Sequence, residues 1–137
     1  MKYLFISLVF LLSISSINAQ KQEISNTQNY VILTKKIPQL QPILLTAEAL
    51  KAEDGNNFGD FQVIICGKTV QKLATTASVP GFLKKAESLG VQIKACGFSL
   101  NKFNVAPQSL PKGMQTVENG ILHNIQLQKK GYTSIEI

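Results

Sequence analysis

Short apolar runs alternate with amphipathic segments along most of this chain, and this alternation constrains the fold more than any other feature. Each apolar run has the length of a strand, and the segments between them carry apolar residues at helical spacing. This order predicts a three-layer α/β/α domain over residues 30–137, built on a five-stranded, mostly parallel sheet. The strands are expected at residues 30–35, 61–66, 91–96, 114–117 and 132–137.

Turn and capping residues place helices between these strands. A helix over residues 42–52 begins with a proline in its first turn. Pro80 opens a second helix, and Gly90 follows it at a typical stop position. Asn119 is expected to cap a third helix, which Gly131 ends before the last strand.

Residues 1–19 have the pattern of a secretory signal peptide. Lys2 precedes an apolar run over residues 4–12, and the expected cleavage site follows Ala19. An uncleaved anchor is the alternative, but the run is shorter than the roughly 20 residues of a membrane span. Residues 20–29 are polar and are expected to form a flexible lead-in. We therefore expect a periplasmic or secreted protein without stable membrane insertion.

The charge pattern narrows the range of partners. All 14 basic residues are lysines, against 8 acidic residues, which gives a net charge of +6. Proteins that read nucleic acid depend on bidentate arginine, so nucleic acid is not an expected partner. Charged residues make up 16% of the chain, below the roughly 25% usual in soluble domains. This deficit favours a homo-oligomer. No nucleotide, metal or flavin fingerprint is present, so we expect no fixed cofactor.

Two cysteines, Cys66 and Cys96, fall at the carboxyl ends of predicted strands. Ligands and chemistry collect beyond these ends in open α/β sheets. Lys94 faces the same side of its strand as Cys96, and its ammonium would favour the thiolate. Gly97 allows a sharp turn, and Ser99 is expected to cap a short helix whose amides would also favour the thiolate. The alternative for Lys94 is an ordinary solvated lysine.

The roles of the two thiols stay open at this level. Cys96 could accept sulfur or act in redox chemistry, or it could be a small buried residue at a strand end. Cys66 could form a disulfide with Cys96 if their strands are neighbours, or it could be an inert buried thiol. The sequence does not show which strands are adjacent.

The motif Cys96-Gly97-Phe98-Ser99 matches the CGFS signature of monothiol glutaredoxins. In those proteins the motif follows an early strand, and a cis-proline segment and a Gly-Gly pair come later. Here three strand–helix units precede the motif, and no such elements follow it. We therefore interpret the match as coincidental.

The segment from Leu89 to Ile137 instead resembles the C-terminal half of the DsrE/DsrF-like family, which has a flavodoxin-like α/β fold. The matching positions are Gly90-Val91, Ile93, Cys96, Ser99-Leu100, Leu110, Gly113, Gly120, Gln128, Gly131 and Tyr132. The resemblance implies an oligomeric domain. It also implies that Cys96 corresponds to the cysteine that carries sulfur as a persulfide between proteins. Relay members generally work in the cytoplasm, so the signal peptide departs from the family pattern.

Two other features have unremarkable interpretations. Gly67-Lys68-Thr69 lacks the full phosphate-loop pattern and is expected to be a turn. His123 is the only histidine; it lies on the polar side of its helix by helical spacing and is expected at the surface.

Two hypotheses of function follow. The first is a cysteine-dependent sulfur carrier or thiol-exchange protein outside the cytoplasm, sulfurtransferase-like, with a persulfide on Cys96 and a protein as sulfur donor or acceptor. Lys94, Gly97 and Ser99 would support the thiolate. The second is a non-catalytic oligomeric module that keeps the fold without the chemistry.

Overall fold

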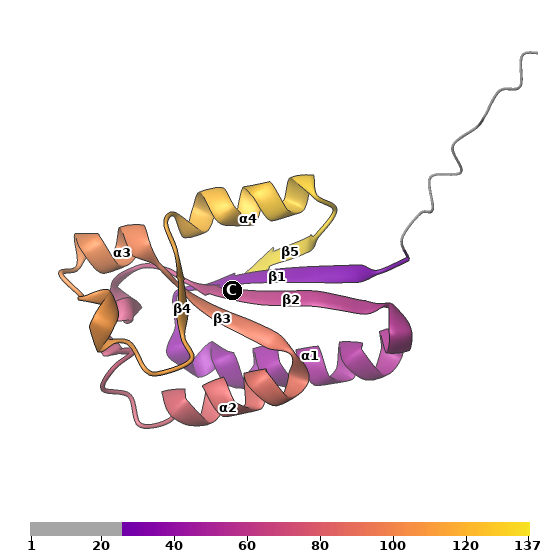
Figure 1. Ribbon diagram of the computed structural model, residues 1–137, viewed down its shortest axis with the longest axis horizontal. Coiled ribbons are helices and arrows are strands. Elements are labelled where there is room, and N and C mark those ends of the chain that lie inside the picture. The colour runs from indigo at the N-terminus through magenta and orange to yellow at the C-terminus, as the bar shows by residue number, and fades with distance from the viewer. Residues whose placement is uncertain (1–25) are drawn as a thin grey trace, which may run out of the picture.

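The computed structural model describes residues 26–137 as a single parallel sheet with helices on both faces (Figure 1). The predicted signal peptide and most of the predicted lead-in lie outside the described residues. Five strands pair in the order β4-β3-β2-β1-β5, and every pair is parallel. The predicted α/β architecture is therefore confirmed.

The strands agree with the predicted runs to within a few residues. They are β1 (Gln28–Thr34), β2 (Phe58–Ile65), β3 (Val91–Cys96), β4 (Gln115–Val117) and β5 (Thr133–Glu136). The largest difference is at β2, which starts three residues before the expected Phe61. Gln28, placed in the lead-in by the sequence, pairs with Phe58 and already belongs to β1.

Within the described residues, four α-helices connect the strands: α1 (Leu40–Asp54), α2 (Val79–Leu89), α3 (Gly97–Lys102) and α4 (Gly120–Lys129). Short 3-10 turns lie at Ile37–Gln39, Gly55–Asn57, Lys68–Lys72 and Pro107–Ser109. The Asn119 cap is confirmed, since its side chain accepts from the amides of Ile121 and Leu122. The predicted Ser99 cap is wrong, because α3 already begins at Gly97 and places Ser99 inside the helix.

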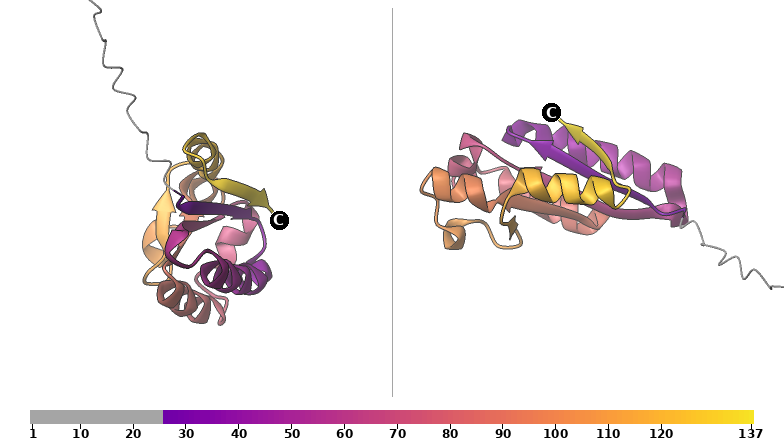
Figure 2. Two further views of the ribbon diagram at one scale, coloured as in Figure 1. Left: turned by 90° about the vertical axis from the view of Figure 1, so that its right-hand side faces the viewer. Right: turned by 90° about the horizontal axis from the view of Figure 1, so that it is seen from above.

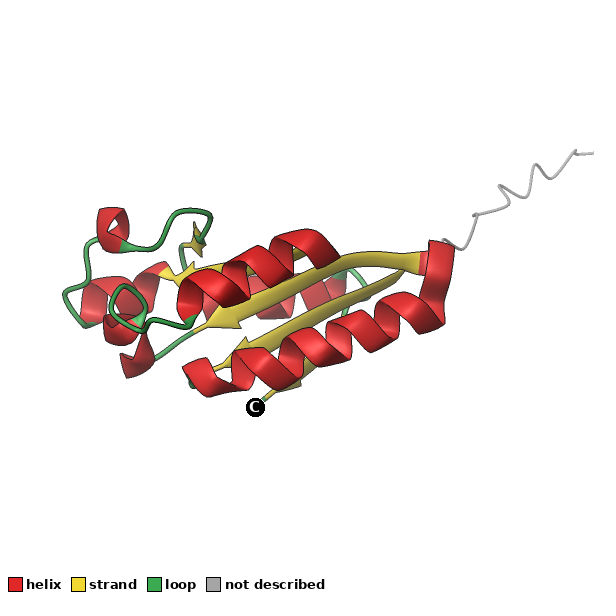
Figure 3. Cartoon of the chain, turned by 90° about the horizontal axis from the view of Figure 1, so that it is seen from below, coloured by secondary structure: helices red, strands yellow, loops and turns green. Residues whose placement is uncertain are grey.

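The chain order decides which helices cover which face. Strands β1 to β4 are laid down in one direction across the sheet, and the right-handed crossover rule puts α1 and α2 on the same face. Figure 3 shows these two helices side by side across that face. The return from β4 to β5 runs the other way and places α4 on the opposite face (Figure 2). The short α3 lies beyond the carboxyl ends of the strands (Figure 1).

The sheet divides the core into two unequal parts. The larger part lies between the sheet and helices α1 and α2; it includes Leu40, Ile43, Phe61, Val63 and Ile93. The smaller part lies under α4. It consists of Val31, Leu33, Ile64, Cys66, Cys96 and Leu127. Both cysteines therefore belong to the smaller core. Across residues 26–137, the helices are too short or too polar to cross a membrane.

Candidate functional site

The two cysteines meet at the carboxyl ends of neighbouring strands. Strands β2 and β3 pair with Ile65 opposite Ala95, so Cys66 and Cys96 follow side by side. Both side chains face α4, and the two thiols are close enough for each to shift the pKa of the other. Adjacent strands are about 4.8 Å apart, within the Cα separation that a disulfide spans. Both residues are thiols in the structure.

Gly120 lets the start of α4 approach this thiol pair. Its amide donates a hydrogen bond to Cys96 Sγ at 3.2 Å. A Cβ atom at this position would lie 2.6 Å from Cys66 Sγ and 3.2 Å from Cys96 Cβ. Only glycine fits without displacing the helix. The positive end of the α4 dipole is therefore held against the sulfurs.

Ser99 connects the ends of the two cysteine strands. Its hydroxyl oxygen accepts from the Gly67 amide at 2.9 Å. Ser99 also lies close enough to Cys96 to lower the pKa of that thiol. The Phe98 amide is directed elsewhere, to the Glu118 carbonyl oxygen at 2.8 Å.

Gly97 allows the turn between β3 and α3 to approach the segment that leads into α4. A Cβ atom there would lie 2.9 Å from the Val117 carbonyl oxygen and 3.1 Å from that of Glu118. The tight turn between β3 and α3 can therefore pack against the segment that leads into α4. This packing holds Ser99 and the Gly120 amide next to Cys96.

The environment gives the two thiols opposite proton affinities. Burial acts to raise the pKa of Cys96, but hydrogen bonds from Ser99, the Gly120 amide and Cys66 outweigh it and leave the pKa below its ordinary value. Burial, followed by the nearby charge of Cys96, raises the pKa of Cys66 to about 12. Cys96 therefore loses its proton more readily than Cys66 does.

Lys94 points away from the thiol pair. Its Nζ donates to Gln62 Oε1 at 2.9 Å. Burial lowers the pKa of Lys94, although the charge of Asp60 acts in the opposite direction. The interactions that lower the pKa of Cys96 are hydrogen bonds, and Lys94 makes none of them. The structure therefore places Lys94 in a different group of side chains from the one expected.

This group is a polar cluster on the α4 face of the sheet. Its members are Asp60, Gln62, Gln92, Lys94, His123 and Tyr132. The Asp60 carboxylate accepts from the Gln92 amide at 2.7 Å and from the Tyr132 hydroxyl at 2.8 Å. The sequence signal for this cluster is a pair of polar residues two positions apart in each of two strands, Asp60 and Gln62 in β2 and Gln92 and Lys94 in β3. The cluster was not predicted from the sequence.

His123 belongs to the polar cluster, so its expected position at the surface is wrong. Its Nε2 lies 2.8 Å from Gln62 Oε1, and burial lowers the pKa of the imidazole. Helical spacing suggested the reverse because it assumes that the apolar side of a helix faces inward. In α4 the inward side carries Gly120, Asn124 and Leu127 instead.

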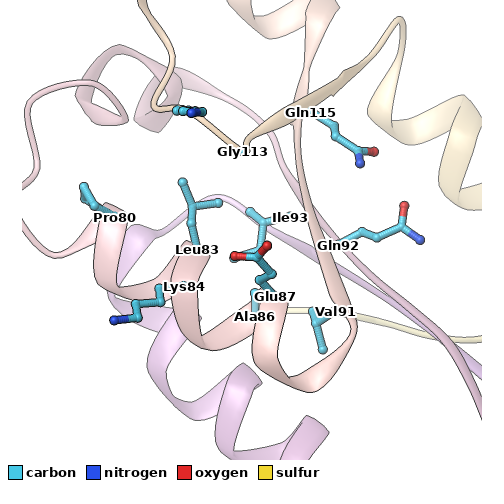
Figure 4. Close-up of a pocket in the computed structure, with 11 residues that line it drawn as sticks. Pro80, Leu83, Lys84, Ala86, Glu87, Val91, Gln92, Ile93, Gly113 and Gln115 are labelled. Carbon is cyan, nitrogen blue, oxygen red and sulfur yellow. The ribbon is translucent and has the colours of Figure 1, made fainter.

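Two cavities lie near these elements. One, of about 250 Å³, is lined by Cys66 together with Leu33, Lys35, Ile121, Ile125 and Glu136, among others. Lys35 and Glu136 form an ion pair of 2.6 Å at its wall. The other, of about 400 Å³, lies between α2 and the edge of β3, and Figure 4 shows its lining, which contains no cysteine. Within residues 26–137, no cluster of three or more acidic, histidine or cysteine side chains could hold a metal ion.

Comparisons with known proteins support the fold and leave the chemistry to the site itself. No protein-family model matches the chain, and no curated protein matches its sequence. A protein of unknown function from Methanobacterium thermoautotrophicum, MTH1491, is structurally similar with a TM-score of 0.65 at 18% identity; the match covers 80% of this chain and all of that one. The conserved protein of unknown function BT1422 from Bacteroides thetaiotaomicron has a TM-score of 0.60 at 21% identity, over 83% of this chain and 98% of its own.

Proposed function

We propose that this protein is a cysteine-dependent sulfur carrier or thiol-exchange protein that holds sulfur as a persulfide on Cys96. The observation that carries the proposal is the hydrogen bond from the Gly120 amide to the Cys96 sulfur at 3.2 Å, with Ser99 and Cys66 beside that sulfur and also lowering its pKa. A buried thiol with no such donors would stay protonated and unreactive. The resemblance of residues 89–137 to the DsrE/DsrF-like family supports sulfur transfer as the chemistry, and the signal-peptide pattern supports action in the periplasm or outside the cell.

The proposed step is a thiolate exchange that conserves atoms and charge. The Cys96 thiolate attacks the outer sulfur of a donor persulfide, the sulfur–sulfur bond of the donor breaks, and the donor leaves as its own thiolate. The product is the Cys96 persulfide. Loss of the outer S–H proton to solvent then leaves the Cys96 persulfide as an anion, and the Gly120 amide and the α4 dipole favour this negative charge.

Persulfide loading tests the proposal. We expect reduced protein that is alkylated immediately after exposure to glutathione persulfide to gain one sulfur atom at Cys96 by mass spectrometry of its peptides. Cys96→Ser should abolish this gain. The matched control is Cys66→Ser, which changes the neighbouring thiol and should still load. Equal loading of the Cys96→Ser chain would contradict the proposal.

A second candidate function is a non-catalytic oligomeric module, and the outer side of α4 favours it. Ile121, Leu122 and Ile125 are 62%, 52% and 45% exposed on a helix whose buried side has Leu127 as its one large apolar residue. Such an inverted distribution is typical of a surface that another protein or another copy covers.

Sedimentation separates this candidate from a monomeric carrier. We expect the wild-type chain to sediment as an oligomer and Ile125→Lys to sediment as a folded monomer. Gln126→Lys adds the same charge to the exposed neighbouring position and is the matched control. A wild-type chain that is monomeric at all concentrations would rule out the module.

A further inference from the structure

We propose that Cys66 is a resolving thiol that discharges the Cys96 persulfide: it attacks Sγ of Cys96, forms a Cys66–Cys96 disulfide and releases the outer sulfur as sulfide. This inference rests on the proposed function, since it needs a persulfide on Cys96. It changes the expected outcome of the chemistry from delivery of sulfur to a partner into reduction of that sulfur to sulfide.

The position of Cys66 is the first argument. The two cysteines follow paired residues of adjacent parallel strands, and both lie against Gly120, where a Cβ atom would be 2.6 Å from Cys66 Sγ and 3.2 Å from Cys96 Cβ. This spacing suits a disulfide without movement of the strands. An intramolecular thiol held at this distance has a large advantage in effective concentration over any thiol in solution.

Access to the site is the second argument. Cys96 is only 3% exposed, under α4, so a small donor such as glutathione persulfide can reach it more easily than the thiol of a folded protein can. Cys66, in contrast, lines the cavity of about 250 Å³ between α4 and β5. This volume admits a small sulfur species such as sulfide, whereas a folded protein partner does not fit into it. The geometry therefore favours attack by the internal thiol.

The step conserves electrons and protons among Cys66, Cys96 and the outer sulfur. The Cys66 S–H bond breaks and its sulfur bonds to Cys96 Sγ, while the bond between Sγ and the outer sulfur breaks. The outer sulfur takes the two electrons of that bond and the proton from Cys66, and it leaves as hydrosulfide. Two thiol sulfurs are oxidised to a disulfide and one sulfane sulfur is reduced. The sulfur donor is therefore the oxidant.

The charges around the pair suit this sequence of events. While Cys96 is a thiolate, its charge helps to raise the pKa of Cys66 to about 12, after the larger effect of burial. Cys66 thus keeps its proton until sulfur is loaded. Transfer of the charge to the outer sulfur then moves it away from Cys66, and the Lys35 ammonium, which lies on the same cavity and lowers the Cys66 pKa, favours an anion there.

The test is a single turnover without oxygen. Fully reduced wild-type protein, Cys66→Ser and Cys96→Ser are each loaded with glutathione persulfide and freed of donor by desalting. The sulfide released afterwards and the mass of each chain are then measured. For the wild type we expect one sulfide per loaded chain and the loss of two hydrogen atoms, with Cys66 and Cys96 peptides linked. Cys66→Ser should keep the added sulfur on Cys96 and release no sulfide.

The outcomes distinguish the inference from the proposed function. A wild-type chain that keeps its persulfide as long as Cys66→Ser does would overturn the resolving role and leave the carrier function standing. Failure of Cys66→Ser and of the wild type to take up sulfur at all would overturn the carrier function, and the resolving role with it. If Cys66→Ser does not fold by circular dichroism, the sulfide and disulfide yields of the wild type decide alone.

Discussion

The two faces of the sheet differ in what they bury. The face under α1 and α2 carries a continuous apolar core, whereas the face under α4 buries a few apolar side chains, two thiols and part of a polar cluster. A thick apolar core suits stability, because apolar area removed from water is the main favourable contribution to folding. The α4 face buries Lys94, Gln62 and the cysteines, whose polar groups contribute less to folding than apolar side chains of the same size. Under the proposed function, stability and reactivity are divided between opposite sides of the same strands.

Chain order explains this division. Two helices cover the first face, while α4 alone returns across the second face and packs against β1, β2 and β5. The α4 side of β3 therefore lacks helix cover over Gln92 and Lys94, and polar side chains can satisfy one another there. The candidate site therefore lies at the boundary between the part of the sheet that α4 covers and the part that no helix covers.

The largest expected effect separates the two faces by stability. Phe61 is fully buried in the larger core, with its ring centroid 5.6 Å from that of Tyr30. We expect Phe61→Ala to lower the free energy of unfolding by about 3–5 kcal/mol, through lost burial and the cavity left behind. Leu127→Ala, in the smaller core, should cost less, about 2–3 kcal/mol. Urea denaturation measures both, and a larger loss for Leu127→Ala would break the comparison.

Gly120→Ala should disturb the α4 face alone. The added methyl group would collide with Cys66 Sγ and with Ile64 Cγ2, each under 3 Å away, so α4 must shift. We expect a loss of about 1–3 kcal/mol in the free energy of unfolding. The Gly120 amide would also retreat from Cys96, so the midpoint of Cys96 alkylation should move to higher pH.

The control for this variant is Gly81→Ala in α2, where a Cβ atom meets nothing within 4 Å. Replacement of a helical glycine in open space should leave stability unchanged or raise it by up to about 1 kcal/mol. Equal losses in the two variants would show that Gly120 is not a point of close approach.

The dependence of stability on alkaline pH should report on Cys66. Its pKa is raised from 9.0 to about 12 in the folded chain, so the folded state keeps a proton that the unfolded chain loses. Stability from Cys66 is therefore complete below pH 9 and declines as the pH rises toward 12. Tyr30 and Tyr132, raised from 10.0 to about 12, add their own decline only above pH 10.

Two variants isolate the contribution of Cys66. Denaturant titrations between pH 9 and pH 10 should show a falling free energy of unfolding for the wild type and a flatter profile for Cys66→Ser. Tyr132→Phe should match the wild type in this interval and diverge from it only above pH 10. A profile for Cys66→Ser that parallels the wild type would mean that Cys66 titrates normally.

The smallest expected effect concerns Lys94. Because its Nζ donates to Gln62 and makes no hydrogen bond to Cys96, Lys94→Met should leave the pH midpoint of Cys96 alkylation unchanged. Loss of a buried ammonium also removes its desolvation cost, so stability should change by no more than about 1 kcal/mol. Ser99→Ala is the contrasting variant and should raise the midpoint. A rise with Lys94→Met would restore the role that the sequence suggested.

Local patterns were sufficient to predict the elements and several of their ends. The period of the apolar residues identified the strands, and Asn119 marked the start of α4 because its side chain caps the helix locally. Ser99 was misassigned as a cap because a serine before a helical segment has the same appearance whether its hydroxyl bonds its own helix or, as here, the Gly67 amide from another loop.

The site could be predicted only in part, since it depends on which strands are neighbours. Cys96 was placed correctly at a strand end, but the contact with Cys66 follows from the pairing of β2 with β3, which the sequence does not encode locally. The sequence also does not show which side of α4 faces the sheet. The close approach at Gly120 turns His123 toward the sheet and leaves Ile121 and Ile125 outside, against the usual amphipathic rule.

Helix α4 and strand β5 come last in the sequence, and this position affects the order in which the protein folds and covers its cysteines. Strands β1 to β3 and helices α1 and α2 form from consecutive segments, whereas β5 pairs with β1 across nearly the whole described chain. Until that last pairing forms, a growing or refolding chain has its thiols uncovered, open to any oxidant in its surroundings. The two thiols are thus shielded only when the C-terminal segment has folded. In a chain that is cut short or folds slowly, the cysteines would be oxidised before the native structure forms.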